Sequence, residues 1–149
     1  MTDDRLSGGW ERDFPQYRPA QLFALVADIE RYPRFVPGCV ATRILARDGP
    51  LWTVDNVFGF GPLRSRFTTL AEIEAPHFLR ITSSDGPWRQ FALTWRLDPQ
   101  GADGCRLGCA FAVTFRSRPL AALARLGQGE MDQRIIAAFE KRAKSLYGS

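Results

Sequence analysis

Histidine and cysteine are scarce in this chain of 149 residues, which contains one histidine and three cysteines. His77 alone cannot form a histidine-based metal cluster, and no two cysteines have the CxxC spacing of a zinc site. Cys105 and Cys109 would lie about 13 Å apart on a strand, which is too far for a disulfide between them. We therefore predict no metal site and expect the protein to work in a reducing compartment.

Long apolar segments and catalytic motifs are also missing. The longest uncharged runs, residues 19–27 and 107–115, fall short of the roughly 18 residues that a membrane-spanning helix needs. Residues 1–10 lack the apolar stretch of a secretory signal. The sequence has no GxSxG, P-loop, GxGxxG or HExxH motif. These absences predict no catalytic residues and a cytoplasmic protein, either free or peripheral to the inner membrane.

Basic residues outnumber acidic residues by 20 to 16, and this excess lies in the second half of the chain. Residues 1–75 contain nine basic and ten acidic residues, whereas residues 76–149 contain eleven and six. A basic half favours an anionic partner, either a phospholipid surface or RNA. A solvated helix face explains the same excess about as well.

Hydrophobic periodicity predicts a strand, short helices, six strands and a long helix, in that order. The first strand covers residues 10–17, and Pro19 then opens a helix that ends at Tyr32-Pro33. Turn signals about 10 to 15 residues apart divide residues 40–116 into an antiparallel meander. Residues 119–147 return to helical spacing, with an interruption at Gly127 and Gly129.

This order of elements predicts a single α+β domain over residues 1–149. A single antiparallel sheet exposes one apolar face, and the long helix is the only element large enough to cover it. We expect a curved sheet of about seven strands that grips this helix and leaves a cavity between them. The candidate residues lining that cavity come from the apolar faces of the strands and the helix: Trp95, Phe111, Val113, Ile135 and Phe139.

Aromatic residues are abundant, with 11 Phe, four Trp and three Tyr. Those on strands can line a pocket for an apolar ring or chain, or they can simply fill the core. Phe35 and Val36 lie between Pro33 and Pro37, which restrict the backbone and would hold an apolar tip at the mouth of the cavity. A rigid loop that seals the core is the alternative interpretation of this segment.

One segment of the chain resembles a known family. Residues 25–39 follow the pattern LVxDIExYPxFxPxC, which resembles the coenzyme Q-binding START-like family, and weaker matches extend over residues 10–148. That family includes mitochondrial quinone-binding proteins and the bacterial ribosome association toxins named RatA. The resemblance implies the helix-grip fold, ubiquinone as a bound ligand, and no covalent cofactor. It also implies a role in respiration or ubiquinone biosynthesis rather than in catalysis.

The resemblance leaves two other functions open. One is a RatA-type toxin that inhibits the association of ribosomal subunits, and the other is a polyketide cyclase or aromatase. A quinone carrier would dock on an anionic membrane, for which Arg134, Lys141 and Lys144 on one helix face are candidates, and a toxin would use the same charges on rRNA. A cyclase needs an acid or base in the cavity, and Arg142, which falls within the apolar stripe, is a poor base.

Overall fold

The computed structural model describes residues 4–60 and 63–148. Within these residues the chain forms one seven-stranded antiparallel sheet with the strand order β1-β7-β6-β5-β4-β3-β2. The strands are β1 (Arg5–Phe14), β2 (Cys39–Asp48), β3 (Leu51–Phe60), β4 (Leu63–Glu74), β5 (Phe78–Ser83), β6 (Trp88–Gln100) and β7 (Gly104–Phe115). The helices are α1 (Pro19–Val26), the 3-10 helix η1 (Ile29–Arg34) and α2 (Arg118–Tyr147). The predicted α+β helix-grip architecture is confirmed.

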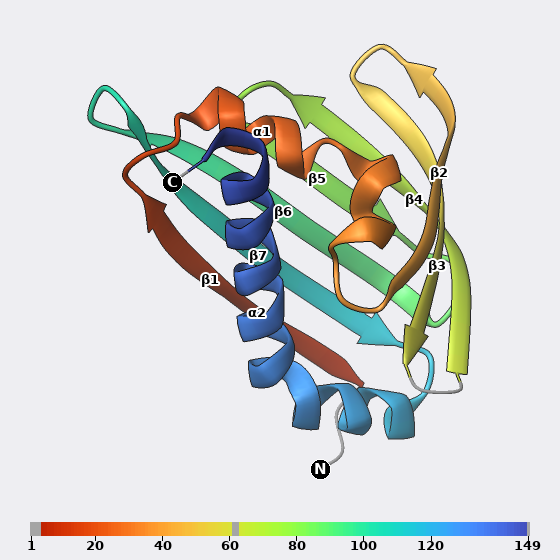
Figure 1. Ribbon diagram of the computed structural model, residues 1–149. Coiled ribbons are helices and arrows are strands. Elements are labelled where there is room, and N and C mark those ends of the chain that lie inside the picture. Colours follow the sequence, from red (N-terminus) through yellow and green to blue (C-terminus); the bar gives the residue numbers. More distant parts are fainter. Residues whose placement is uncertain (1–3, 61–62, 149) are drawn as a thin grey trace.

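All three helices lie on the same face of the sheet, which we call the inner face (Figure 1). Helix α2 packs on β1, β7 and α1, while α1 packs on β6 and β7, and η1 packs on β2. Strands β2 to β7 follow one another as a meander, and β1 joins the sheet beside β7. The long helix therefore covers one end of the sheet, and the short helices cover other parts of the same face.

Strand β1 begins at Arg5 and ends at Phe14, so the predicted strand over residues 10–17 is placed too late. Gly8 and Gly9 lie inside the strand, where glycine usually signals a break. A Cβ on Gly8 would lie 2.3 Å from Gln128 Nε2, which is the movable end of a side chain of α2. A Cβ on Gly9 would lie 2.7 Å from the carbonyl oxygen of Cys109. Gly9 therefore allows the close approach of β7, because the backbone of that strand cannot move aside.

The first helix is shorter than the sequence predicts. It ends at Val26, and the chain continues as η1, which contains Pro33. The Tyr32 hydroxyl donates a hydrogen bond to the Val26 carbonyl, which a longer α-helix would offer to the amide of Glu30. The predicted stop at Tyr32-Pro33 is therefore wrong for the α-helix, and these residues instead belong to the 3-10 turn that follows it.

Helix α2 runs from Arg118 to Tyr147, although its sequence predicts an interruption at Gly127 and Gly129. The Ser117 side chain accepts a hydrogen bond from the Leu120 amide at 3.3 Å and so caps its first turn. Both glycines keep helical structure, and the light-blue start of α2 runs at an angle to its dark-blue end (Figure 1). Paired glycines allow such bending without ending a helix.

The main hydrophobic core lies between α1, the C-terminal half of α2 and strands β5 to β7. Its most deeply buried side chains come from all of these elements, namely Leu22, Val26, Leu79, Leu97, Leu107 and Ala143. A second cluster forms where η1 packs on the sheet, around Ile29, Val54 and Ala71. A third cluster lies under the N-terminal half of α2, around Val113, Phe115 and Ala121.

Candidate ligand-binding site

A row of apolar side chains on the inner face is left partly uncovered. Phe111 of β7 is paired with Leu93 of β6, and Leu93 is paired with Ile81 of β5. All three side chains are half-buried, although they lie in three adjacent central strands. Ile81 and Leu93 adjoin the main core, whereas Phe111 adjoins the third cluster. This row, which we call the apolar row, therefore bridges two separate clusters.

Two of the predicted lining residues, Trp95 and Phe139, are packed in the core. They are 4% and 3% exposed, and their ring centroids lie 5.1 Å apart. Trp95 also contacts Trp10 edge to face at 5.7 Å. Their rings therefore fill the space beneath the C-terminal half of α2, where the open cavity was expected, and contact with a ligand remains a prediction for both.

Phe35 and Val36 follow η1 and are half-buried. The Phe35 ring lies 5.2 Å from Phe139 and 5.8 Å from Tyr32, with nearly perpendicular planes in both pairs. Val36 packs against the main core and the second cluster. The expected apolar tip is therefore turned inward, because its aromatic ring finds partners on α2 and η1.

The other predicted lining residues are divided between two regions. Ile135 is half-buried and packs against the main core, near Phe139 on the same helix. Val113 is buried in the third cluster, and Phe111 lies at the edge of that cluster. The structure therefore brings Phe35, Val36, Trp95, Ile135 and Phe139 together and places Phe111 and Val113 apart from them.

A hollow of about 410 Å³ lies on the opposite, outer face of the sheet. Small residues of three adjacent strands, including Gly9, Ala110 and Thr94, form part of its lining, and charged residues including Arg96 and Arg106 contribute to the rest. This hollow is not the predicted cavity, because it is on the far side of the sheet from α2.

Two buried N–H groups on the described residues have no hydrogen-bond acceptor, namely Trp88 Nε1 and Arg142 Nε. The Trp88 ring is enclosed by Phe67, Phe91 and Phe115, with centroids 5.2 to 5.3 Å away. Buried polar groups normally have partners, so each exception needs an explanation. Trp88 lies at the third cluster, whereas Arg142 lies beside Phe35 at the main core.

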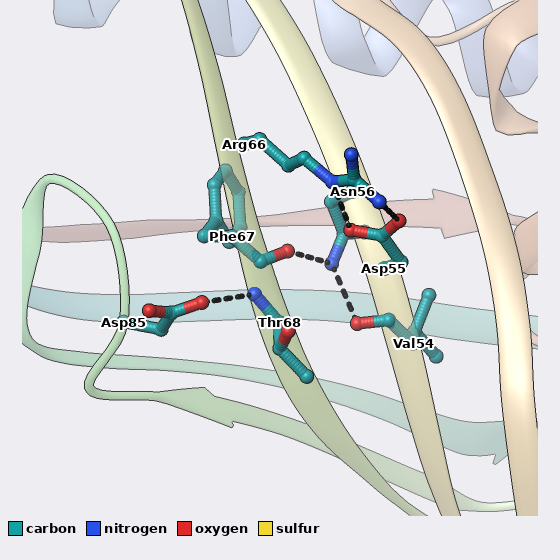
Figure 2. A network of polar contacts seen from close by, with 7 residues as sticks. All are labelled: Val54, Asp55, Asn56, Arg66, Phe67, Thr68 and Asp85. Carbon is teal, nitrogen blue, oxygen red and sulfur yellow. Dashed lines mark hydrogen bonds and ion pairs between the residues drawn. The ribbon is translucent and has the colours of Figure 1, made fainter.

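A polar pair, Asn56 and Thr69, lies buried on the inner face among apolar residues. Asn56 Nδ2 donates to the carbonyl oxygens of Val54 and Phe67, at 3.3 and 3.2 Å, and to Thr69 Oγ1 at 3.0 Å. Figure 2 shows the two bonds to carbonyl oxygens, with the Asp55–Arg66 pair nearby. No sequence motif indicates this pair, although the alternation of β3 places Asn56 on the same face as Val54.

The three cysteines are free and buried. Burial raises the pKa of Cys39 and of Cys105 to about 11, and that of Cys109 to about 12. Thiols with such high pKa values hold almost no thiolate at neutral pH, and thiolate is the nucleophilic form. No group of His, Cys, Asp or Glu among the described residues could hold a metal ion.

The three predicted membrane-docking residues, Arg134, Lys141 and Lys144, are exposed on α2. Their exposure leaves them accessible to a large anionic surface. Glu140, on the same helix, is instead paired with Arg12 of β1 at 2.7 Å. No helix of the described chain has the length and apolar character needed to cross a membrane.

This fold, a curved antiparallel sheet beside a long helix, is shared with known proteins. A sequence profile described as polyketide cyclase/dehydrase and lipid transport matches residues 15–140. The chain belongs to this family. The resemblance to START-like and coenzyme Q-binding proteins predicted from residues 25–39 is therefore confirmed at the family level.

Some relatives of this chain are named as toxins, and another is named as a coenzyme Q-binding protein. It is 28% identical to the persistence and stress-resistance toxin PasT of Escherichia coli, over 89% of this chain and 84% of the relative. It is 29% identical to the ribosome association toxin RatA of Pseudomonas aeruginosa, over 89% and 92%. It is 27% identical to the coenzyme Q-binding protein COQ10 homolog B of Xenopus laevis, over 86% of this chain and 54% of that longer protein.

Two solved structures have the same fold as this chain. An 18 kDa protein from Caulobacter crescentus is 31% identical, with a TM-score of 0.75 and coverage of 97% of this chain and 99% of that protein. A Streptomyces aromatase/cyclase has a TM-score of 0.77 at 12% identity, with coverage of 97% and 99%. That second similarity concerns the fold alone, because the identity is low.

Proposed function

We propose that this protein binds a prenylated quinone, with ubiquinone as the ligand, and carries it without catalysing a reaction. The observation that carries the proposal is the apolar row of Ile81, Leu93 and Phe111, which is half-buried in the middle of the inner face. Burying apolar surface contributes roughly 25 cal/mol per Å². An isoprenoid chain lying along this row would bury surface that α2 leaves uncovered.

The buried N–H groups support a quinone over a plain hydrocarbon. Trp88 Nε1 and Arg142 Nε each lack an acceptor among the described residues. A quinone ring carries carbonyl oxygens, which accept hydrogen bonds and offer no donor. Leaving a buried donor unpaired costs about 1–3 kcal/mol, so a ligand that supplies an acceptor gains a corresponding advantage.

Delivery of such a ligand requires contact with a membrane. The exposed Arg134, Lys141 and Lys144 of α2 provide positive charge for this contact, and each such residue near an anionic surface contributes about 1 kcal/mol. The Xenopus relative is named as a coenzyme Q-binding protein, which agrees with this choice of ligand. A carrier of this kind would support respiration or ubiquinone biosynthesis, at the inner face of a bacterial membrane.

The proposal is tested by placing an amide in the apolar row. Leu93→Asn should abolish the quenching of tryptophan fluorescence by a short-chain ubiquinone in detergent, because the polar group opposes burial of the ligand chain. Leu70→Asn is the matched control, since Leu70 is 43% exposed and pairs with Thr82 in the same sheet. Equal quenching in the wild type and both folded variants would contradict binding at this row.

Binding to ribosomal subunits is the second candidate function, favoured by a relative named RatA that aligns over 92% of its length. The same exposed basic residues of α2 would then contact rRNA phosphates, and binding would weaken steeply with salt. Sedimentation with purified ribosomal subunits at low and high salt tests this candidate. Co-sedimentation that requires Arg134, Lys141 and Lys144 at low salt would favour it over the carrier function.

A further inference from the structure

The guanidinium of Arg142 is unusual among the arginines of this chain. Its side chain is half-buried on α2, and its Nε is sealed from solvent without a hydrogen-bond acceptor. By contrast, Arg66 and Arg106 pair with carboxylates at 2.6 and 2.8 Å, although both are exposed. Arg116 donates to two backbone carbonyl oxygens. Arg142 differs from these three arginines, because its buried Nε has no acceptor among the described residues.

Arg142 stands beside the aromatic groups that follow the first helix. Its guanidinium carbon lies 5.4 Å from the centroid of the Phe35 ring. Phe35 in turn contacts Phe139 at 5.2 Å and Tyr32 at 5.8 Å. A cation over an aromatic face gains some electrostatic stabilisation, but this contact does not satisfy an N–H group that lies in the plane of the guanidinium.

The described residues do not supply the missing acceptor. The Tyr32 hydroxyl donates to the Val26 carbonyl, and its oxygen accepts no hydrogen bond from Arg142 Nε. Glu140, two residues before Arg142, is paired with Arg12 of β1. Arg142 makes no ion pair with any residue in the described ranges, and its guanidinium instead lies over the Phe35 ring.

We propose that Arg142 binds an acceptor oxygen on the ring of the ligand and so selects ligands with oxygenated rings over plain isoprenoid chains. This inference rests on the proposed function, because it places the head group of the same ligand between α2 and η1. The Phe35 ring provides an apolar edge for the ring of the ligand, and Arg142 Nε–H provides the donor. A carbonyl oxygen fits this site, because it accepts a hydrogen bond without bringing a second charge into an aromatic environment.

The test compares two ligands that share one apolar chain. Decyl-ubiquinone carries ring carbonyl oxygens, whereas decylbenzene has the same chain on a ring without oxygen. Apparent dissociation constants are measured in detergent for the wild type, Arg142→Met and Arg142→Lys. Arg118→Met is the matched control, because Arg118 is exposed on the same helix and is not one of the docking residues.

We expect the wild type to prefer decyl-ubiquinone and Arg142→Met to lose about 10- to 100-fold of that preference, the range expected for a hydrogen bond from a charged group. Affinity for decylbenzene should stay unchanged in all variants. Arg142→Lys should lose most of the preference, since it retains the charge but has no Nε–H. Arg118→Met should behave as the wild type.

A second measurement separates ligand binding from a structural role. Without ligand, Arg142→Met should unfold at the same or a higher urea concentration than the wild type, because the substitution removes a buried unpaired donor.

A preference for decyl-ubiquinone over decylbenzene that survives in a folded Arg142→Met would overturn the inference and leave the carrier function standing. If the wild type bound neither ligand, the proposed function itself would fail. Tighter binding of decyl phosphate that depends on Arg142 would also overturn the inference, by assigning the site to anions.

Discussion

Phe139 lies on the sheet-facing side of α2, as expected, but its ring is packed in the core and does not line an open cavity. Its ring contacts Trp95, Phe35 and Tyr32, with centroids 5.1 to 6.4 Å away. Phe139→Ala should therefore lower the free energy of unfolding by about 3–5 kcal/mol, measured by urea denaturation. Leu126→Ala on the same helix, where Leu126 is 87% exposed, should change it by less than about 0.5 kcal/mol. A small loss at Phe139 together with weaker ligand retention would instead show that the ring lines open space.

Asp132 gives the fold a pH dependence with a definite sign. Partial burial on α2 raises the pKa of this carboxyl above its ordinary value of 3.8. The folded state then holds more protons than the unfolded state between 3.8 and the raised pKa, so stability falls as pH rises through that window. Asp132→Asn should consequently be more stable than the wild type at pH 7, and the difference should vanish near pH 3. A variant that is less stable at pH 7 would contradict this account.

At the scale of residues, sequence alternation predicts the face of a side chain but not its exposure. The alternation over residues 91–97 places Leu93 and Trp95 on one apolar face, and the structure agrees. Trp95 is nevertheless buried and Leu93 is half-buried, because α1 and α2 do not cover the whole face. The unpaired Nε of Arg142 has no sequence signal at all, since it depends on which acceptors the fold brings near.

Helix α2 carries both the apolar stripe that packs on the sheet and the exposed basic residues. Changing Arg134, Lys141 and Lys144 together to Ala should weaken binding to vesicles that contain anionic phospholipid by removing up to three charges. Quinone binding in detergent should stay intact, since these side chains point away from the core. Vesicle flotation and fluorescence quenching measure the two properties separately. Unchanged flotation at low salt would remove these residues from the docking surface.

At the scale of elements, most of the chain was predictable from turns and periodicity. Gly49 and Gly86 adopt positive φ angles of 58° and 68°, in the turns that the sequence indicates. The errors occur where local signals meet tertiary contacts. Gly8 and Gly9 of β1 resemble a break, but Gly9 serves close packing with β7. The glycines of α2 resemble an interruption but are tolerated within one bent helix.

For the whole molecule, the pairing of β1 with β7 makes β1 an edge strand of the sheet, and α2 packs on both of these strands. The order of elements predicts one sheet and one covering helix, because a single apolar sheet face needs a cover. The order of elements does not predict how much of the inner face of the sheet α2 covers. The partial exposure of the apolar row is a property of the assembled inner face, and it is the feature on which the proposed function depends.

The central claim is that this protein holds a prenylated quinone by apolar burial. The most direct test is to purify the native protein at about 0.5 M salt, where phosphate contacts are strongly weakened, and to analyse its organic extract by mass spectrometry. We predict a prenylated quinone in an amount comparable to that of the protein, because apolar burial is not screened by salt. Absence of quinone, together with sedimentation of the protein with a ribosomal subunit at low salt, would contradict the claim.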